Sequence, residues 1–126
     1  MLEKIDLLPN DSLLRRVQFL DPLFIKEDGT PASSSFTLKK LKDGRFEDGL
    51  SVEVERLTTF QTAIQDVNRF RLFALTVAYV QSLELACEHD PLPDNFAHAL
   101  IKGNISRSVA RKLAQGTVRI PFPEEG

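Results

Sequence analysis

The sequence predicts a single α+β domain with a largely antiparallel sheet and two main helices. Residues 49–55 alternate apolar and polar side chains, as a strand with one buried face does. Asp-Gly pairs at 28–29, 43–44 and 48–49 are typical of tight hairpin turns. The strand patterns are grouped before and after a helical one, and the regular alternation of a doubly wound fold is missing. These observations favour the α+β class.

The length of 126 residues suffices for one domain whose core needs no disulfides. We expect this domain to span residues 13–120. An N-terminal extension at 1–12 precedes it, and a flexible C-terminal tail follows at 121–126. The tail contains two prolines and an acidic end, which favour fraying over a regular element.

The first half of the chain is expected to hold strands at 13–19, 36–38 and 49–55. The first is favoured over a short helix capped by Ser12, because valine and phenylalanine suit a strand. In the third, the face of Leu50 should be buried and the face of Glu53 solvated. Thr58 and Gln61 form a capping-box pattern, which predicts a helix over 58–67.

The stretch 71–102 carries the longest apolar run and is expected to form two or three adjacent core strands. Residues 72–80 are apolar on both faces, which favours a central strand, although a continuation of the preceding helix also fits the spacing. Shorter strands are expected at 85–89 and 96–101. Two prolines in the loop between them would interrupt any single strand.

The last helix is predicted at 105–115, where Ile105, Val109 and Leu113 form one apolar stripe. Asn104 is the expected N-cap, and Gly116 the residue that ends the helix. Residues 118–120 are expected to add an edge strand.

Composition and charge narrow the classes of function. The net charge of −2 gives no overall field that would attract nucleic acid or an anionic membrane. One cysteine excludes an internal disulfide and a cysteine-rich zinc site, and it fits a reducing compartment. The N-terminus has acids where a signal peptide needs basic residues, and no run approaches the roughly 20 apolar residues of a membrane span. We expect a soluble cytoplasmic protein with no cofactor, no metal and no membrane partner.

The two histidines are the first candidates for chemistry. His89 and His98 lie nine residues apart and would approach each other if their strands pair. Either could act as an acid or a base, so His98 is the candidate catalytic residue and His89 a candidate ligand-binding residue. The more common outcome for such residues is that His98 is a hydrogen-bonded core residue and His89 a polar residue at a loop edge.

Arg15 and Arg16 are candidates for binding an anion. On a strand they point to opposite faces, so one of them could enter a pocket and hold a phosphate or carboxylate through two hydrogen bonds. The serines of the following loop, Ser33, Ser34 and Ser35, would line such a site. The alternative is a solvent-exposed arginine pair beside a plain serine loop.

Two further features are weaker candidates. Cys87 could be a nucleophile if a base lowered its pKa, but a buried inert thiol is the more common case. A basic patch near the last helix could contact nucleic acid or an acidic partner, although only one aromatic residue lies close to it. The patch consists of Lys102, Arg107, Arg111 and Lys112. Glycine-rich phosphate loops and the GxSxG pattern are absent from the sequence.

Four segments resemble a family of small, mostly bacterial, uncharacterised proteins. They are LLRRV, SSSF to GLSVE, DPLPDNFAHALI and SVARKLA, and the resemblance covers roughly residues 13–114. It implies a stand-alone intracellular domain and draws attention to Arg15, Ser35, Ser51 and His98. It brings no activity, no ligand and no site residue.

Three hypotheses of function follow. The lack of a converging catalytic set favours a non-enzymatic domain that binds a protein partner in the bacterial cytoplasm. The alternative is a small enzyme, or enzyme-like domain, that binds a small anionic ligand of phosphate-bearing or nucleotide type through Arg15 or Arg16, with His98 as acid or base. Nucleic-acid binding through the basic patch is the third, and the low net charge disfavours it.

Overall fold

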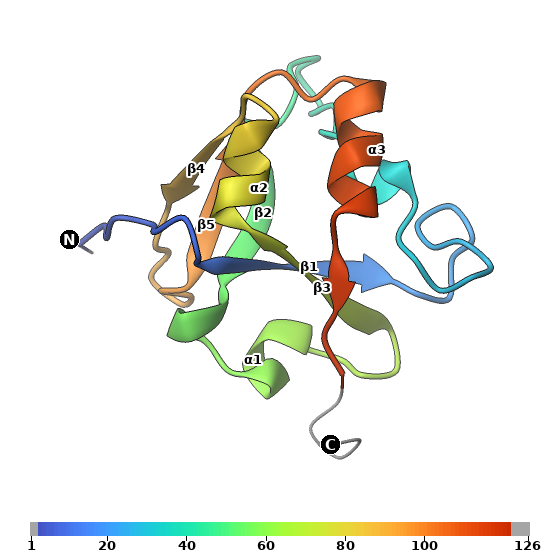
Figure 1. The fold of residues 1–126 in the computed structure, drawn as a ribbon, viewed down its shortest axis with the longest axis horizontal. Helices are drawn as coiled ribbons and strands as arrows, with labels where there is room; N and C mark the ends of the chain where they lie inside the picture. The colour runs from blue at the N-terminus through green and yellow to red at the C-terminus, as the bar shows by residue number, and fades with distance from the viewer. Residues whose placement is uncertain (1–2, 122–126) are drawn as a thin grey trace.

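One antiparallel sheet organises the fold. The computed structural model describes residues 3–121, and six strands form the sheet in the order β4-β5-β2-β1-β3-β6 (Figure 1). The strands are Ser12–Gln18 (β1), Leu50–Val54 (β2), Phe70–Thr76 (β3), Ala86–His89 (β4), His98–Lys102 (β5) and Val118–Arg119 (β6). The helices are Phe60–Ile64 (α1), Val77–Ser82 (α2) and Arg107–Gln115 (α3), with 3-10 turns at Ser33–Phe36 (η1) and Glu55–Leu57 (η2). The predicted α+β class is confirmed.

Both faces of the sheet carry apolar side chains, but the larger core lies on one of them. There α2, α3 and η1 cover the sheet (Figure 1). Leu13 and Val52 pack in this core with Phe36, Val80 and Leu113, all of them buried. Because strand side chains alternate between faces, the residues next to Leu13 and Val52 along their strands belong to the opposite face.

The smaller core lies under α1 on that opposite face. Leu14 and Leu72 come from β1 and β3, and Ala63 and Ile64 from α1. The two-sided burial of the central strands explains why the sequence shows long apolar runs there. Within residues 3–121, no helix is long and apolar enough to cross a membrane.

The apolar run at 72–80 holds two elements, so the prediction of one strand was only half right. β3 ends at Thr76, whose hydroxyl accepts a hydrogen bond from the backbone N–H of Tyr79 and caps α2. The N–H groups of Val77 and Ala78 donate to the carbonyls of Asp11 and Pro9. These contacts satisfy the first turn of a helix and end the strand.

The expectation of adjacent strands across 71–102 was correct for β4 and β5 only. β4 pairs with β5 along its whole length, whereas β3 pairs with β1 and β6. β2 and β1 lie between β5 and β3 in the sheet. β3 and β4 are consecutive in the sequence, but in the sheet they are separated by β5 and by two strands from the first half of the chain.

Two other predicted elements differ from the structure. Residues 36–38 form no strand, since Phe36 ends η1 with its ring in the core. The helix predicted at 58–67 is shorter: Thr59 rather than Thr58 caps it, and Gln65 ends it with a φ of 63°. Val67 was expected on its apolar stripe but is 47% exposed.

The last helix begins later than predicted. Ser106 caps α3 by accepting from the N–H of Val109, so Asn104 is not the N-cap. Gly116 does end the helix, as predicted. A Cβ at this glycine would lie 2.3 Å from a ring carbon of Tyr79, so the position needs a residue without a side chain.

The segment before β1 packs against the domain. The N–H of Ile5 donates to Nδ1 of His89, and Lys4 forms an ion pair with Glu88 on β4. Next to β1, Asp11 accepts hydrogen bonds from the guanidinium of Arg56. The expected C-terminal tail lies, from residue 122 onward, outside the described residues.

Candidate ligand-binding cleft

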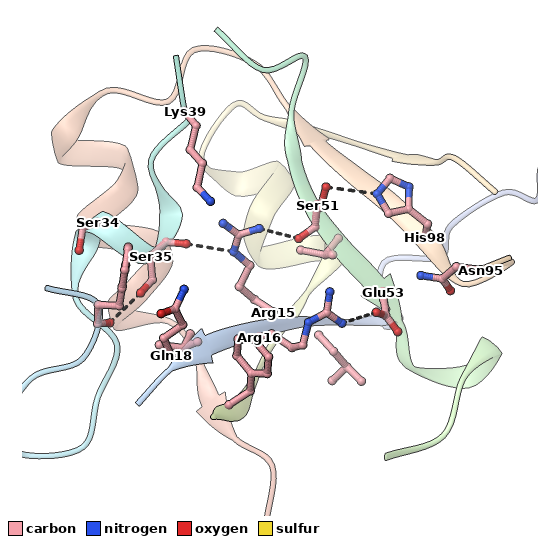
Figure 2. A pocket seen from close by; sticks show the side chains of 15 residues that line it. Arg15, Arg16, Gln18, Ser34, Ser35, Lys39, Ser51, Glu53, Asn95 and His98 are labelled. Carbon is pink, nitrogen blue, oxygen red and sulfur yellow. Dashed lines mark hydrogen bonds and ion pairs between the residues drawn. The ribbon is translucent and has the colours of Figure 1, made fainter. Parts of the chain in front are cut away.

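A gap inside the sheet creates the candidate site. β1 pairs with β3 from Ser12 to Gln18, but it pairs with β2 only at Leu13 and Leu14. β2 follows β5 instead, from Leu50 to Glu53. The two strands therefore diverge, and the space between them is a cleft of about 220 Å³ (Figure 2).

Arg15 connects the two sides of this cleft. Its Nε donates to the carbonyl oxygen of Ser35 at 3.0 Å, and its Nη1 donates to that of Ser51 at 2.7 Å. Its guanidinium carbon lies 5.9 Å from the ring centroid of Phe36. These contacts fix the guanidinium in one place and use two of its five N–H donors, so three remain for other partners.

Positive charge in the cleft exceeds the nearby negative charge. Burial lowers the pKa of Arg15, and the nearby positive charge of Arg16 lowers it further, whereas the carboxylate of Glu47 raises it. The guanidinium of Arg15 still carries its charge at neutral pH. Figure 2 shows the amine of Lys39 pointing toward Arg15. Within residues 3–121, no carboxylate forms an ion pair with Arg15 or Lys39.

Arg16 and Glu53 form a partly buried ion pair at the other end of the cleft. The Nη1 of Arg16 donates to Oε1 of Glu53 at 2.6 Å and to the carbonyl of Ala63 at 2.7 Å. Glu53 is only 4% exposed, although its face of β2 was predicted to be solvated. The prediction fails at Glu53 because Arg16 of the neighbouring strand covers this position, whereas Ser51 and Glu55 of the same face are exposed as expected. Among the described residues, no donor reaches Oε2 of Glu53.

His98 sits at the edge of the cleft and is hydrogen-bonded on both sides of its ring. Nε2 lies 3.2 Å from the hydroxyl of Ser51, and Nδ1 lies 2.9 Å from the carbonyl oxygen of Asp90. The carboxylate of Asp90 is 3.3 Å from the same Nδ1. The side chain of His98 is 14% exposed, so it can reach a molecule in the cleft.

The structure brings together most, but not all, of the site residues suggested by the sequence. Arg15, Arg16, Ser34, Ser35 and His98 line the cleft. Both arginines reach it even though they point to opposite faces, because the cleft opens between two strands rather than over one face of the sheet.

The serines contribute less than the sequence suggested. The hydroxyl of Ser35 donates to the carbonyl of Phe24 at 2.6 Å, and that of Ser34 donates to the carbonyl of Leu23. Both hydrogen bonds connect η1 to the preceding loop. Ser33 is not among the residues that line the cleft. The serine loop therefore supports the site mainly through its backbone.

His89 lies away from the cleft, so its predicted role in ligand binding is not supported. β4 pairs with β5 as expected, but His89 is opposite Ala99, which places its ring and that of His98 on different faces of the sheet. It is 2% exposed. Its Nδ1 accepts from the N–H of Ile5, and its Nε2 donates to the carbonyl of Phe96 at 2.7 Å. His89, rather than His98, is therefore the fully buried core histidine.

Cys87 is half-buried on β4, and we expect its thiol to be unreactive. Burial raises its pKa to about 11, and within the described residues no positive group offsets this effect. We expect iodoacetamide to alkylate Cys87 in the folded protein about 100-fold more slowly at pH 8 than a thiol of pKa 9, because thiolate is the reactive form. Alkylation followed by mass spectrometry, with the urea-unfolded protein as control, measures this. Equal rates in both states would contradict the assignment.

Five polar or charged residues of the cleft were not proposed from the sequence as ligand contacts, and the first of them along the chain, Gln18, is the last residue of β1. Ser51 and Glu53 share a strand face, and their alternation with apolar residues could have indicated a polar face on β2. Lys39 and Asn95 come from irregular segments. No periodic pattern marks such positions, so only the three-dimensional structure identifies them.

Comparison with known proteins adds no family or relative. No family model matches the chain, no curated protein matches it, and no solved structure matches it.

Proposed function

We propose that the cleft between β1 and β2 binds a small molecule bearing a phosphate or carboxylate group. The observation that carries this proposal is the placement of Arg15: a fixed guanidinium with three N–H donors left, and no carboxylate as ion-pair partner among the described residues. Lys39 adds a second positive charge on the same side. A planar guanidinium matches a phosphate or carboxylate in a two-hydrogen-bond geometry.

The volume of the cleft and the accessibility of its polar groups restrict the class of ligand further. A cleft of about 220 Å³ is smaller than the roughly 300–1,000 Å³ of pockets for drug-sized molecules. It therefore favours a compact anion over a complete dinucleotide. Glu53 is not available to the ligand, because its Oε1 accepts from Arg16 and its Oε2 is closed off from solvent.

A thermal-shift assay with inorganic phosphate tests the proposal. At 10 mM phosphate and a Kd of about 1 mM, binding stabilises the native state by about 1.4 kcal/mol. We expect this to raise the Tm by about 4 °C relative to potassium chloride of equal ionic strength.

Two variants separate binding in the cleft from a general salt effect. Lys39→Ala should keep the Tm of the free protein within about 1 °C and reduce the phosphate shift at least two-fold, because Lys39 is exposed and lines the cleft. Lys40→Ala removes an equally exposed charge next to it and should leave the shift unchanged. The proposal fails if phosphate and chloride give the same Tm, or if both variants lower the shift equally.

The other hypotheses stay predictions. A non-enzymatic domain with a protein partner, acting in the cytoplasm, would use exposed apolar side chains such as Leu20 and Leu23. Nucleic-acid binding would use the basic patch, in which Lys102 is already paired with Glu88. The convergence of charged groups in the cleft supports the small anionic ligand more than either of these.

A further inference from the structure

The hydrogen bonds of His98 determine which ring nitrogen carries the proton. A backbone carbonyl can only accept, so the contact of 2.9 Å between Nδ1 and the carbonyl oxygen of Asp90 requires a proton on Nδ1. In the neutral ring, Nε2 is then unprotonated and accepts from the hydroxyl of Ser51 at 3.2 Å. The imidazole is therefore in the form that can take a proton from Ser51.

The carboxylate of Asp90 completes a chain of three side chains. Its Oδ2 lies 3.3 Å from Nδ1 of His98, on the side of the ring away from Ser51. A carboxylate in this position orients the imidazole and stabilises the imidazolium that forms when Nε2 accepts a proton. The three residues come from β2, β5 and the loop after β4, so the fold rather than a local motif assembles them.

Ser51 lies between this chain and the positive end of the cleft. Figure 2 shows its hydroxyl directed to His98 and its carbonyl oxygen directed to Arg15. Ser51 is exposed, and it lines the same cleft as both of these residues. A molecule whose anionic group is bound by Arg15 would place its neighbouring atoms near the hydroxyl of Ser51.

We propose that Ser51 is a nucleophile, activated by His98 and positioned by Asp90, that hydrolyses a small ester bearing an anionic group. The assignment rests on the proposed function, since Arg15 and Lys39 would bind the anionic group. Ser51 and His98 are the catalytic residues, and Asp90 is a positioning residue.

The reaction balances with water as the only co-reactant. The oxygen of Ser51 attacks the ester carbonyl carbon while its proton moves to Nε2 of His98. The carbon–oxygen bond to the alcohol breaks, the alcohol leaves with that proton, and an acyl ester on Ser51 remains. Water then attacks the acyl carbon, its proton returns through His98 to Ser51, and a carboxylic acid leaves. No oxidation or reduction occurs.

Labelling with a fluorophosphonate, which reacts with activated serines by loss of fluoride, tests the proposal. We expect Ser51 to be labelled at least 100-fold faster than Ser108, an exposed serine on α3, as located by peptide mass spectrometry. Ser51→Ala should abolish the fast labelling, and Ser108→Ala should not change it. His98→Gln should slow it by about 100-fold, the usual contribution of a general base.

Asp90→Asn distinguishes positioning from a structural role. It should slow labelling at least ten-fold and change its pH profile, since the imidazolium loses its carboxylate, while circular dichroism stays unchanged. The proposal is overturned if Ser51 reacts no faster than Ser108, or if His98→Gln leaves its rate unaltered.

The effect of phosphate on the Tm and on labelling distinguishes a failure of the Ser51 assignment from a failure of the anion site. Protection of Ser51 by 10 mM phosphate supports both. If phosphate shifts the Tm but Ser51 is unreactive, the anion site is supported and Ser51 is not a nucleophile. If Ser51 is reactive but phosphate changes neither the Tm nor the labelling, Ser51 is a nucleophile and the anionic substrate is contradicted.

Discussion

Arg16→Met should destabilise the protein by about 3 kcal/mol, the largest effect expected for a polar substitution near the cleft. The reason is that Glu53 is 4% exposed and Arg16 is its only ion-pair partner among residues 3–121. Removing one member of a buried pair leaves an uncompensated charge in a poorly solvated place, which costs about 3–5 kcal/mol. The side chain of Arg16 is 29% exposed, which places the expected value at the lower end of this range.

Two further variants make this prediction specific to the ion pair. Glu53→Met should cost less than Arg16→Met, because the remaining arginine can turn toward water whereas the remaining carboxylate cannot. The double variant should recover much of the loss, since no buried charge is left. Urea unfolding followed by circular dichroism measures all three. Equal losses in both single variants, with simple addition in the double variant, would show that the buried charge is not the cause.

Asp11→Asn should lower the free energy of unfolding at pH 7 by about 2 kcal/mol. Its carboxylate accepts from Nε of Arg56 at 2.6 Å, from Nη2 at 3.2 Å and from the N–H of Leu8 at 2.7 Å. Hydrogen bonds to a charged group contribute about 1.5–3 kcal/mol, and an amide at this position can accept at only one atom. The substitution also weakens the connection between the N-terminal segment and η2.

The stability that Asp11→Asn removes should be largest near neutral pH and should decrease in acid. Hydrogen bonding to Arg56 lowers the pKa of Asp11 below the ordinary 3.8, burial of the carboxyl opposes this, and the N–H of Leu8 adds to the lowering. A lowered folded-state pKa contributes stability that is fully present above the unfolded pKa and is lost as the pH falls through the folded pKa. The difference between wild type and variant should therefore be constant from pH 7 to about pH 5 and shrink below pH 4.

Urea titrations of both proteins at pH 7, 5 and 3 check this dependence. Asp94→Asn, which replaces an exposed carboxylate, is the matched control and should change stability by less than about 0.5 kcal/mol. A difference that stays constant down to pH 3 would contradict the assignment to Asp11.

Local patterns predicted the sheet better than the helix boundaries. The alternation around Val52 identified β2, because one face of that strand is buried and the pattern has period two. The start of α3 was misplaced because Asn104 and Ser106 both carry capping side chains two residues apart, and only the backbone decides between them. The start of α2 could not be located from the sequence, because a buried strand and a buried helix turn are equally apolar.

The cleft itself could be predicted only in part. Arg15 and His98 were proposed from residue type, since guanidinium and imidazole groups are the usual ligands for anions and protons. The divergence of β1 from β2 has no local signature, because it depends on β2 pairing with β5, a strand almost 50 residues later in the chain. The burial of Glu53 follows from the same pairing, which places Arg16 beside it.

We propose above that the cleft between β1 and β2 binds a small anion through Arg15 and Lys39, and NMR can test this at the level of single residues. The most direct measurement is a titration of ¹⁵N-labelled protein with inorganic phosphate, followed by NMR. We expect saturable shifts of the Arg15 Nε–H resonance and of the backbone amides of Lys39, Ser51 and His98, with Arg107 and Arg111 of α3 unaffected. Shifts confined to α3, or none up to 20 mM phosphate, would contradict it.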